Sequence, residues 1–145
     1  MRRVMCVLLL LASGGAAGLS AQKPPVRENE RNAGFKLEQN YPNPFNPETR
    51  IPFVLDEILF DDGEPPTVSI RILNILGQFV ASPVALSVPS GEGLPLLQVE
   101  YPIPGRYEAY WDGRDRNGNL VASGVYLVKL IVDGKEDLMK MFVTK

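Results

Sequence analysis

The residues best suited to chemistry are four Asx side chains within one short stretch. They are Asp112, Asp115, Asn117 and Asn119. Oxygen ligands at alternate positions beside glycine are similar to part of a calcium loop, because Ca²⁺ binds carboxylate and carbonyl oxygens. The closing bidentate glutamate of such a loop is missing, and Asx residues also suit the backbone of a tight turn. We favour a structural turn and keep calcium as the lesser alternative.

Residue types that do covalent or acid/base catalysis are scarce. The chain has no histidine, its one cysteine is Cys6, and no serine lies in a Gly-x-Ser-x-Gly elbow. This removes most nucleophilic triads and zinc sites. Glu57 could pair with Asp61 or Asp62, but a solvated acidic loop is the preferred interpretation. The sequence predicts no cofactor and indicates that the protein is not an enzyme.

Six aromatic residues offer another kind of site, a binding platform for sugar or peptide. They are Tyr41, Phe45, Tyr107, Tyr110, Trp111 and Tyr126. Aromatic residues more often pack in a core or along a sheet edge, so we favour packing over a platform.

The Asx residues lie between two segments of alternating apolar residues. The alternation runs over 107–111 and resumes over 126–132, which predicts a strand, a polar turn and a strand. Gly113 and Gly118 permit the positive backbone angles of a tight reversal. Trp111, at the start of the turn, is expected to cover one end of the core.

Other segments alternate in the same way and are separated by turn residues. We expect an extended edge segment over 35–47, a strand over 49–55 that Pro52 directs toward a sheet edge, an acidic loop over 56–66, a hairpin joining 67–74 to 78–81, and a long connection over 82–105 with a short strand near 96–101.

The C-terminus reads as a hairpin closed by the tight turn Asp133-Gly134. Pairing Val132 with Lys135 then sets Val128 opposite Met139 and Tyr126 opposite Met141. The inward residues of the last strand would be Met139, Met141 and Val143, and the outward ones Lys140 and Thr144. About seven short strands in all predict an all-β fold, an immunoglobulin-like antiparallel β-sandwich.

The N-terminus has the pattern of a secretory signal peptide over residues 1–21. Arg2 and Arg3 precede a short apolar run, and small residues lead to a cleavage point after Ala21. The apolar run is too short for a membrane anchor, which needs roughly 20 apolar residues. Residues 22–34 are polar and read as a flexible lead-in to a single domain over 35–145.

The composition after Ala21 limits the partners of the exported chain. It contains no cysteine, so we expect no disulfide, and no stable membrane span remains after signal cleavage. Loss of Arg2 and Arg3 takes the 15 basic residues to 13 against 17 acidic ones. Such a net charge does not attract nucleic acid or anionic lipid.

Six strings together resemble a known family, the type A C-terminal sorting domain of the type IX secretion system. That family is similar in pattern to the immunoglobulin-like domain of the flagellar hook-capping protein FlgD. The strings are Asn40-Tyr41-Pro42-Asn43-Pro44-Phe45 with the Asn-Pro that follows, residues 49–55, residues 70–78, Trp111-Asp112-Gly113, Gly124-Val125-Tyr126, and the final residues 140–145. The resemblance covers residues 35–145.

The resemblance implies a protein exported to the periplasm and then to the cell surface or the medium. Its partner would be the secretion translocon or another outer-membrane protein. The residues that would carry recognition are Gly124, Val125, Tyr126, Lys140, Val143 and Lys145. An exposed strand edge, to which an extended peptide can add, is the expected mode of recognition.

The sequence departs from that family in what precedes the domain. The family's sorting domains usually follow a large secreted enzyme or adhesin, whereas only residues 22–34 stand between the signal peptide and this domain. The chain would then act alone, or be a fragment of a longer gene. The alternative function is that of a stand-alone FlgD-like sandwich with a structural or adhesive role in the periplasm or at the cell surface.

Overall fold

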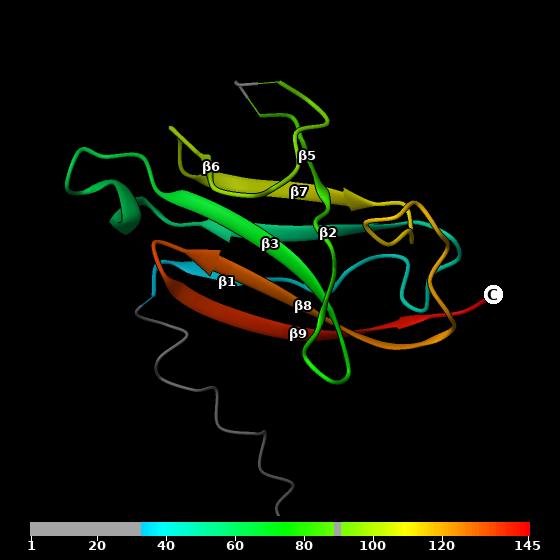
Figure 1. Ribbon diagram of the computed structural model, residues 1–145. Coiled ribbons are helices and arrows are strands. Elements are labelled where there is room, and N and C mark those ends of the chain that lie inside the picture. The colour runs from blue at the N-terminus through cyan, green and yellow to red at the C-terminus, as the bar shows by residue number, and fades with distance from the viewer. Residues whose placement is uncertain (1–32, 89–90) are drawn as a thin grey trace, which may run out of the picture.

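A computed structural model describes residues 33–88 and 91–145 (Figure 1). Nine strands and one short 3₁₀ helix follow one another along this part of the chain: β1 (Phe35–Leu37), β2 (Thr49–Leu55), η1 (Glu57–Phe60), β3 (Thr67–Asn74), β4 (Phe79–Ala81), β5 (Val84–Leu86), β6 (Val99–Glu100), β7 (Gly105–Trp111), β8 (Gly124–Val132) and β9 (Lys135–Val143). The predicted signal peptide, and all of the lead-in except Ala33 and Gly34, lie outside the described residues.

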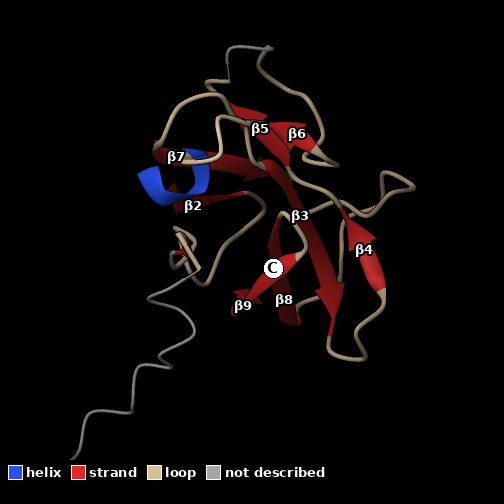
Figure 2. Ribbon diagram, turned by 90° about the vertical axis from the view of Figure 1, so that its left-hand side faces the viewer, coloured by secondary structure: helices blue, strands red, loops and turns tan. Residues whose placement is uncertain are grey.

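The strands form two antiparallel sheets that pack face to face (Figures 1 and 2). One sheet has the order β1-β2-β7-β5, and the other has the order β4-β3-β8-β9, with β6 paired to the start of β3. This arrangement confirms the immunoglobulin-like antiparallel β-sandwich. The described residues contain nine strands instead of about seven. Within the long connection over 82–105, β6 is the short strand expected near 96–101, and β5 is a strand that was not expected.

Period-two alternation builds the core between the sheets. Ile51, Phe53 and Leu55 on β2 are buried, and so are the inward residues of β3 and β8, where Ile70 lies opposite Leu130. Each such side chain, fully buried, stabilises the fold by roughly 1.5–3 kcal/mol.

The C-terminal hairpin has the predicted register. Val132 pairs with Lys135, and the ladder continues to Gly124 opposite Val143. Asp133 and Gly134 have φ angles of 48° and 81°, the two positive values of a two-residue turn that suits the twist of a hairpin. Met141 and Val143 are buried, while Lys140 and Thr144 are exposed.

The two strands on either side of the Asx residues are present as predicted. They do not pair with each other, so the tight reversal expected between them is wrong. β7 pairs with β2 and β5 in one sheet, whereas β8 pairs with β3 and β9 in the other. The loop over 112–123 therefore crosses between the sheets. Both strands turn one face to the same core, so alternation alone does not tell to which sheet each belongs.

Pro52 lies in an inner strand, and its expected position at a sheet edge is wrong. β2 has β1 on one side and β7 on the other. The Pro52 carbonyl accepts a hydrogen bond from the Glu38 amide at 2.9 Å, where β1 has just ended. The proline nitrogen faces the same side of the strand, so the missing N–H falls where regular pairing stops.

The hairpin over 67–81 is confirmed as β3 and β4, with Gly77 at φ 77° in its turn. The acidic loop over 56–66 contains the one short helix of the described chain, η1 (Figure 2). Within residues 33–88 and 91–145, no helix has the length and apolar character needed to cross a membrane.

Candidate functional site

The string Asn40 to Phe45 lies against the outer edge of the last strand, nearly 100 residues away in sequence. Asn43 Oδ1 accepts a hydrogen bond from the Phe142 amide at 3.0 Å. The Phe45 amide donates to the Phe142 carbonyl, and the Phe45 carbonyl accepts from the Thr144 amide, both at 3.0 Å. Phe45 thus makes a parallel bridge to Val143. The string closes the C-terminal half of the β9 edge.

The aromatic and glycine residues of the family strings meet beneath this closed edge. Phe45 is 1% exposed and packs edge-on against Trp111, with ring centroids 5.3 Å apart. Gly113 has φ 74°, and a Cβ atom there would lie 2.2 Å from the Pro47 carbonyl oxygen. Only glycine permits both this backbone angle and this close approach. Trp-Asp-Gly is therefore the packing partner of the proline-rich string.

Asn40 fixes the start of the same string from inside. It is 2% exposed, and its Nδ2 donates to Thr49 Oγ1 at 3.0 Å and to the Pro42 carbonyl at 3.2 Å. The Thr49 hydroxyl also donates to the Pro42 carbonyl, at 3.1 Å. Buried polar groups stabilise a fold when they have partners, and these groups satisfy one another.

The six predicted recognition residues divide into two structural groups. Lys140 and Lys145 are exposed, Gly124 is exposed at the start of β8, and Val125 is half-buried. Val143 is buried in the core. Tyr126 points inward, with its ring 5.9 Å from that of Trp111 and its hydroxyl donating to the Ala122 carbonyl at 2.9 Å. The inward pair supports the hairpin, and the outward residues are the ones that a partner can contact.

The outer edges of β1, β4 and β5 each form a backbone hydrogen bond with another part of the chain. On β1, the Leu37 amide donates to Asp137 Oδ2 of β9 at 2.9 Å. On β4, the Val80 carbonyl accepts from the Arg116 amide at 3.0 Å, and on β5 the Ala85 amide donates to the Leu94 carbonyl at 2.7 Å. Strand addition, the expected mode of recognition, would have to displace such contacts first.

Two of the four Asx side chains of the candidate calcium loop, those of Asp112 and Asp115, accept hydrogen bonds from the loop's own backbone. Asp115 Oδ1 accepts from the amides of Asn117 and Asn119 at 2.9 and 3.0 Å, and Asp112 Oδ1 accepts from the Arg114 amide at 3.0 Å. The described residues contain no group of three or more Asp or Glu side chains placed to bind a metal ion. These contacts are those of Asx turns.

The six aromatic residues do not form one platform. Phe45 and Trp111 are buried, and Tyr107 and Tyr126 are half-buried on the inward side. Tyr41 and Tyr110 lie on the outer face of the four-stranded sheet, where their hydroxyls donate to Glu108 and Glu48. The first four pack in the core, as favoured from the sequence.

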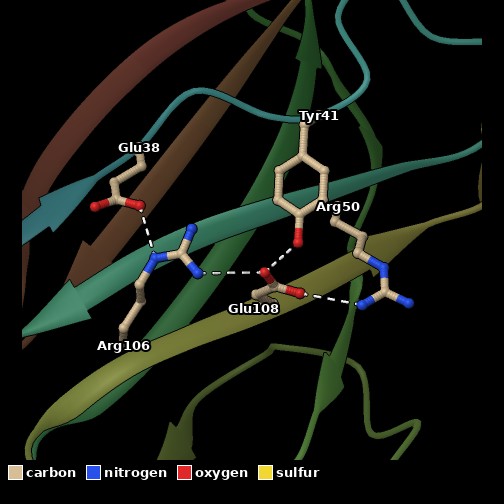
Figure 3. Close-up of polar contacts among 5 residues, drawn as sticks. All are labelled: Glu38, Tyr41, Arg50, Arg106 and Glu108. Carbon is tan, nitrogen blue, oxygen red and sulfur yellow. Dashed lines mark hydrogen bonds and ion pairs between the residues drawn. The ribbon is translucent and has the colours of Figure 1, made fainter.

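A polar network on the outer face of the four-stranded sheet was missed from the sequence (Figure 3). Glu108 accepts a hydrogen bond from the Tyr41 hydroxyl and forms ion pairs with Arg50 at 3.3 Å and Arg106 at 3.5 Å. Arg106 also pairs with Glu38 at 2.9 Å. The strand register places Arg50 beside Glu108 only once β2 and β7 are paired, and no spacing in the sequence indicates that pairing.

The network shifts the pKa values of its members in opposite directions. The hydrogen bond from the Tyr41 hydroxyl is the largest effect that holds the pKa of Glu108 below its usual 4.5. Burial opposes it, and the hydrogen bond and charge of Arg50 and the charge of Arg106 lower the pKa further. The hydrogen bond to Glu108 raises the pKa of Tyr41. A carboxylate with several donors and a lowered pKa stays ionised at neutral pH, so Glu108 is a poor general acid there.

Tyr101 is a second feature that the sequence did not indicate. Its side chain is fully buried, with ring centroids 4.5 Å from Tyr107 and 5.6 Å from Phe53. Among the described residues, its hydroxyl is the one buried side-chain oxygen or nitrogen without a hydrogen-bond partner. Burial raises the pKa of Tyr101 well above its usual range. The phenol serves as a core aromatic.

No protein-family model and no curated protein matches the chain. Among solved structures, the chain is similar to PorZ, an essential bacterial surface component of the type IX secretion system of Porphyromonas gingivalis, with a TM-score of 0.43 and 22% identity over 83% of this chain and 13% of PorZ. It is also similar to dimeric latent PorU from the same organism, with a TM-score of 0.49 and 21% identity over 77% of this chain and 10% of PorU.

A third similar structure belongs to another functional class. It is the alkylpurine DNA glycosylase AlkC of Pseudomonas fluorescens bound to DNA, with a TM-score of 0.43 and 12% identity over 78% of this chain and 31% of that one. The chain thus spans a small part of each of these proteins. At these identities and TM-scores the likenesses assign neither a family nor a function.

Proposed function

We propose that this chain is a non-catalytic targeting module, a sorting domain recognised by the type IX secretion apparatus for export or attachment to the cell surface. The observation that carries the proposal concerns the family strings at 40–47, 111–113 and 124–126. They are far apart in the sequence and meet around the last strand, β9. Asn43 and Phe45 contact the last strand, and Trp111 and Gly113 pack beneath them. The strings that carry the resemblance are therefore in contact with one another in the folded domain.

This arrangement gives the last hairpin the properties that a recognition element needs. Its inward residues, Met141 and Val143, anchor it in the core. Lys140 and Lys145 stay exposed. A rigid scaffold with exposed side chains presents one defined surface to a receptor.

The remaining parts of the proposal follow from the expected export. The chain would cross the inner membrane on its signal peptide, reach the periplasm, and then pass to the cell surface or the medium. Its partner would be the translocon or another outer-membrane protein. No cofactor, nucleic acid or catalysis forms part of the proposal.

The test is to insert a periplasm-compatible reporter between residues 22 and 32 of the full chain, in a host with a working type IX system. We expect the reporter at the surface or in the medium. The double substitution Lys140→Ala and Lys145→Ala should reduce export several-fold, because both side chains lie on the recognition element and outside the core. Lys36→Ala, an exposed lysine on β1, is the matched control.

Retention of the parent chain in the periplasm would overturn the sorting function. It would favour the alternative, a stand-alone FlgD-like sandwich with a structural or adhesive role. Equal thermal unfolding of the parent and the variants, followed by circular dichroism, separates lost recognition from lost folding.

A further inference from the structure

The outer face of the five-stranded sheet combines exposed apolar side chains with cations. Leu138 and Phe142 on β9 are 53% and 45% exposed. The register sets Lys129 beside Leu138 and Leu127 beside Lys140, so apolar and basic side chains alternate across β8 and β9. Arg71 extends the pattern to β3, where it lies opposite Lys129 in the β3–β8 register. We call these six residues the apolar-basic face.

The charge of this face is opposite to that of the exported chain. Arg71, Lys129 and Lys140 are basic, and Glu136 is the one carboxylate at an outward position of strands β3, β8 and β9. Glu136 pairs with Lys129 at 3.3 Å, which leaves Arg71 and Lys140 without a carboxylate partner among the described residues. Cations around exposed leucine and phenylalanine suit an acidic surface with an apolar centre.

The C-terminal half of the outer β9 edge is unsuited to strand addition, because its backbone groups already bind other parts of the chain. The Phe142 and Thr144 amides donate to Asn43 and Phe45, and the Phe142 carbonyl accepts from Phe45. The Leu138 amide donates to Asp137 Oδ1 at 2.8 Å. An added strand needs such groups free. Around Phe142 and Thr144 the hairpin therefore offers its side chains to a partner instead of its backbone.

We infer that the apolar-basic face is the docking surface of this module, and that it takes an acidic protein surface with an apolar centre, by face-to-face contact and without strand addition. The inference rests on the proposed function, since the protein surface in question belongs to the secretion apparatus. Leu138 and Phe142 supply the apolar contact, and Arg71 and Lys140 supply the charge complementarity.

The experiment uses the full-chain reporter described above and two charge reversals, Arg71→Glu and Lys140→Glu, singly and together. The double variant should lower export about tenfold or more, because like charges placed across an interface oppose binding. Phe142→Ser should lower export comparably, since it removes the largest exposed apolar side chain of the face. Lys36→Glu reverses an exposed lysine on β1 and should export as the parent does.

Asn43→Ala distinguishes contact by the face from strand addition. This substitution frees the Phe142 amide at the β9 edge. Strand addition predicts more export from this variant, whereas the apolar-basic face predicts the same or less. Thermal unfolding of each purified variant verifies that it is folded, and all of these outward side chains lie outside the core.

The outcomes separate the inference from the proposed function. If the parent is exported and the face variants are exported equally well, the docking surface is wrong and the sorting function stands. If the parent stays in the periplasm, the sorting function is wrong, and with it the assignment of the face. Sedimentation of the purified protein with phosphatidylglycerol vesicles, lost in the charge reversals, would assign the face to a membrane and overturn the protein partner.

Discussion

The last strand, β9, differs between its edge and its outer face: backbone groups on the edge are covered by the chain, whereas side chains on the face are exposed. The C-terminal half of the edge is covered by Asn43 and Phe45: the Asn43 side chain accepts from the Phe142 amide, and the Phe45 carbonyl accepts from the Thr144 amide. The outer face leaves Leu138 and Phe142 about half exposed. An unpaired strand edge binds any extended peptide, whereas a side-chain surface discriminates by shape and charge. This difference is why we propose docking through the side chains of the face and not through the edge.

The strongest way to break the closed edge is Phe45→Ala. Phe45 is 1% exposed, and its removal should lower the free energy of unfolding by about 3–5 kcal/mol, the loss typical of a buried phenylalanine. Urea unfolding measures it. Tyr41→Ala, in the same string but 44% exposed, should cost below about 1 kcal/mol. Similar losses in both variants would show that Phe45 does not anchor the string.

Gly113→Ala breaks the packing beneath the edge. Its Cβ would meet the Pro47 carbonyl oxygen at 2.2 Å in a backbone conformation with positive φ, so we expect a loss of about 3 kcal/mol. Gly118→Ala is the matched control, because φ is 84° there and no atom lies within 4 Å of the added Cβ. It should cost only about 1 kcal/mol. Equal costs in urea unfolding would rule out the contact with Pro47.

Asn43→Ala opens the edge without removing a core residue. It leaves the Phe142 amide without its acceptor, which should cost about 1–2 kcal/mol. The exposed Asn46, changed to alanine, should stay within about 0.5 kcal/mol of the parent. Analytical ultracentrifugation should also detect more self-association in Asn43→Ala, since a free edge can pair with a second copy. A monomer as stable as the parent would contradict this role of Asn43.

The outer face of the four-stranded sheet sharpens the comparison through its pH dependence. There Glu108 and Glu38 together pair with Arg50 and Arg106, whereas the apolar-basic face leaves Arg71 and Lys140 without a carboxylate partner among the described residues. The folded-state pKa of Glu108 is lowered, so its contribution is present above pH 4.5 and is lost as pH falls through that lower pKa.

Glu108→Gln should therefore lower Tm by roughly a few degrees at pH 7, an effect limited by solvent screening at this exposed site. The difference between parent and variant should shrink as pH falls below 4.5 and disappear once pH is below the lowered pKa of Glu108. Lys36→Gln, which changes an exposed charge on β1, is the control and should show no such pH dependence. A constant difference from pH 7 to pH 3 would contradict a role for the Glu108 charge.

A calcium titration examines the Asx loop. We expect no change in Tm on adding calcium, because Asp115 Oδ1 already accepts two backbone amides and Asp112 Oδ1 accepts a third. An increase in Tm that Asp115→Asn abolishes would restore the calcium site.

Local patterns were enough to predict the sandwich class, the β3–β4 hairpin and the register of β8 and β9. In the last hairpin, alternation and the Asp133-Gly134 turn depend on neighbouring residues alone, so they agree without any distant contact. The short strand Val84–Leu86 was missed because three residues between prolines carry too little alternation.

The sequence by itself determined which residues face inward, because the pleat turns every second side chain to the same side. Only the tertiary structure decided which strands are neighbours, since β7 and β8 show the same alternation and belong to different sheets. Pairing across long sequence separations brought Glu108 to Arg50 and Asn43 to Phe142. Those contacts form only when the whole sandwich has folded, and for that reason no local sequence pattern predicts them.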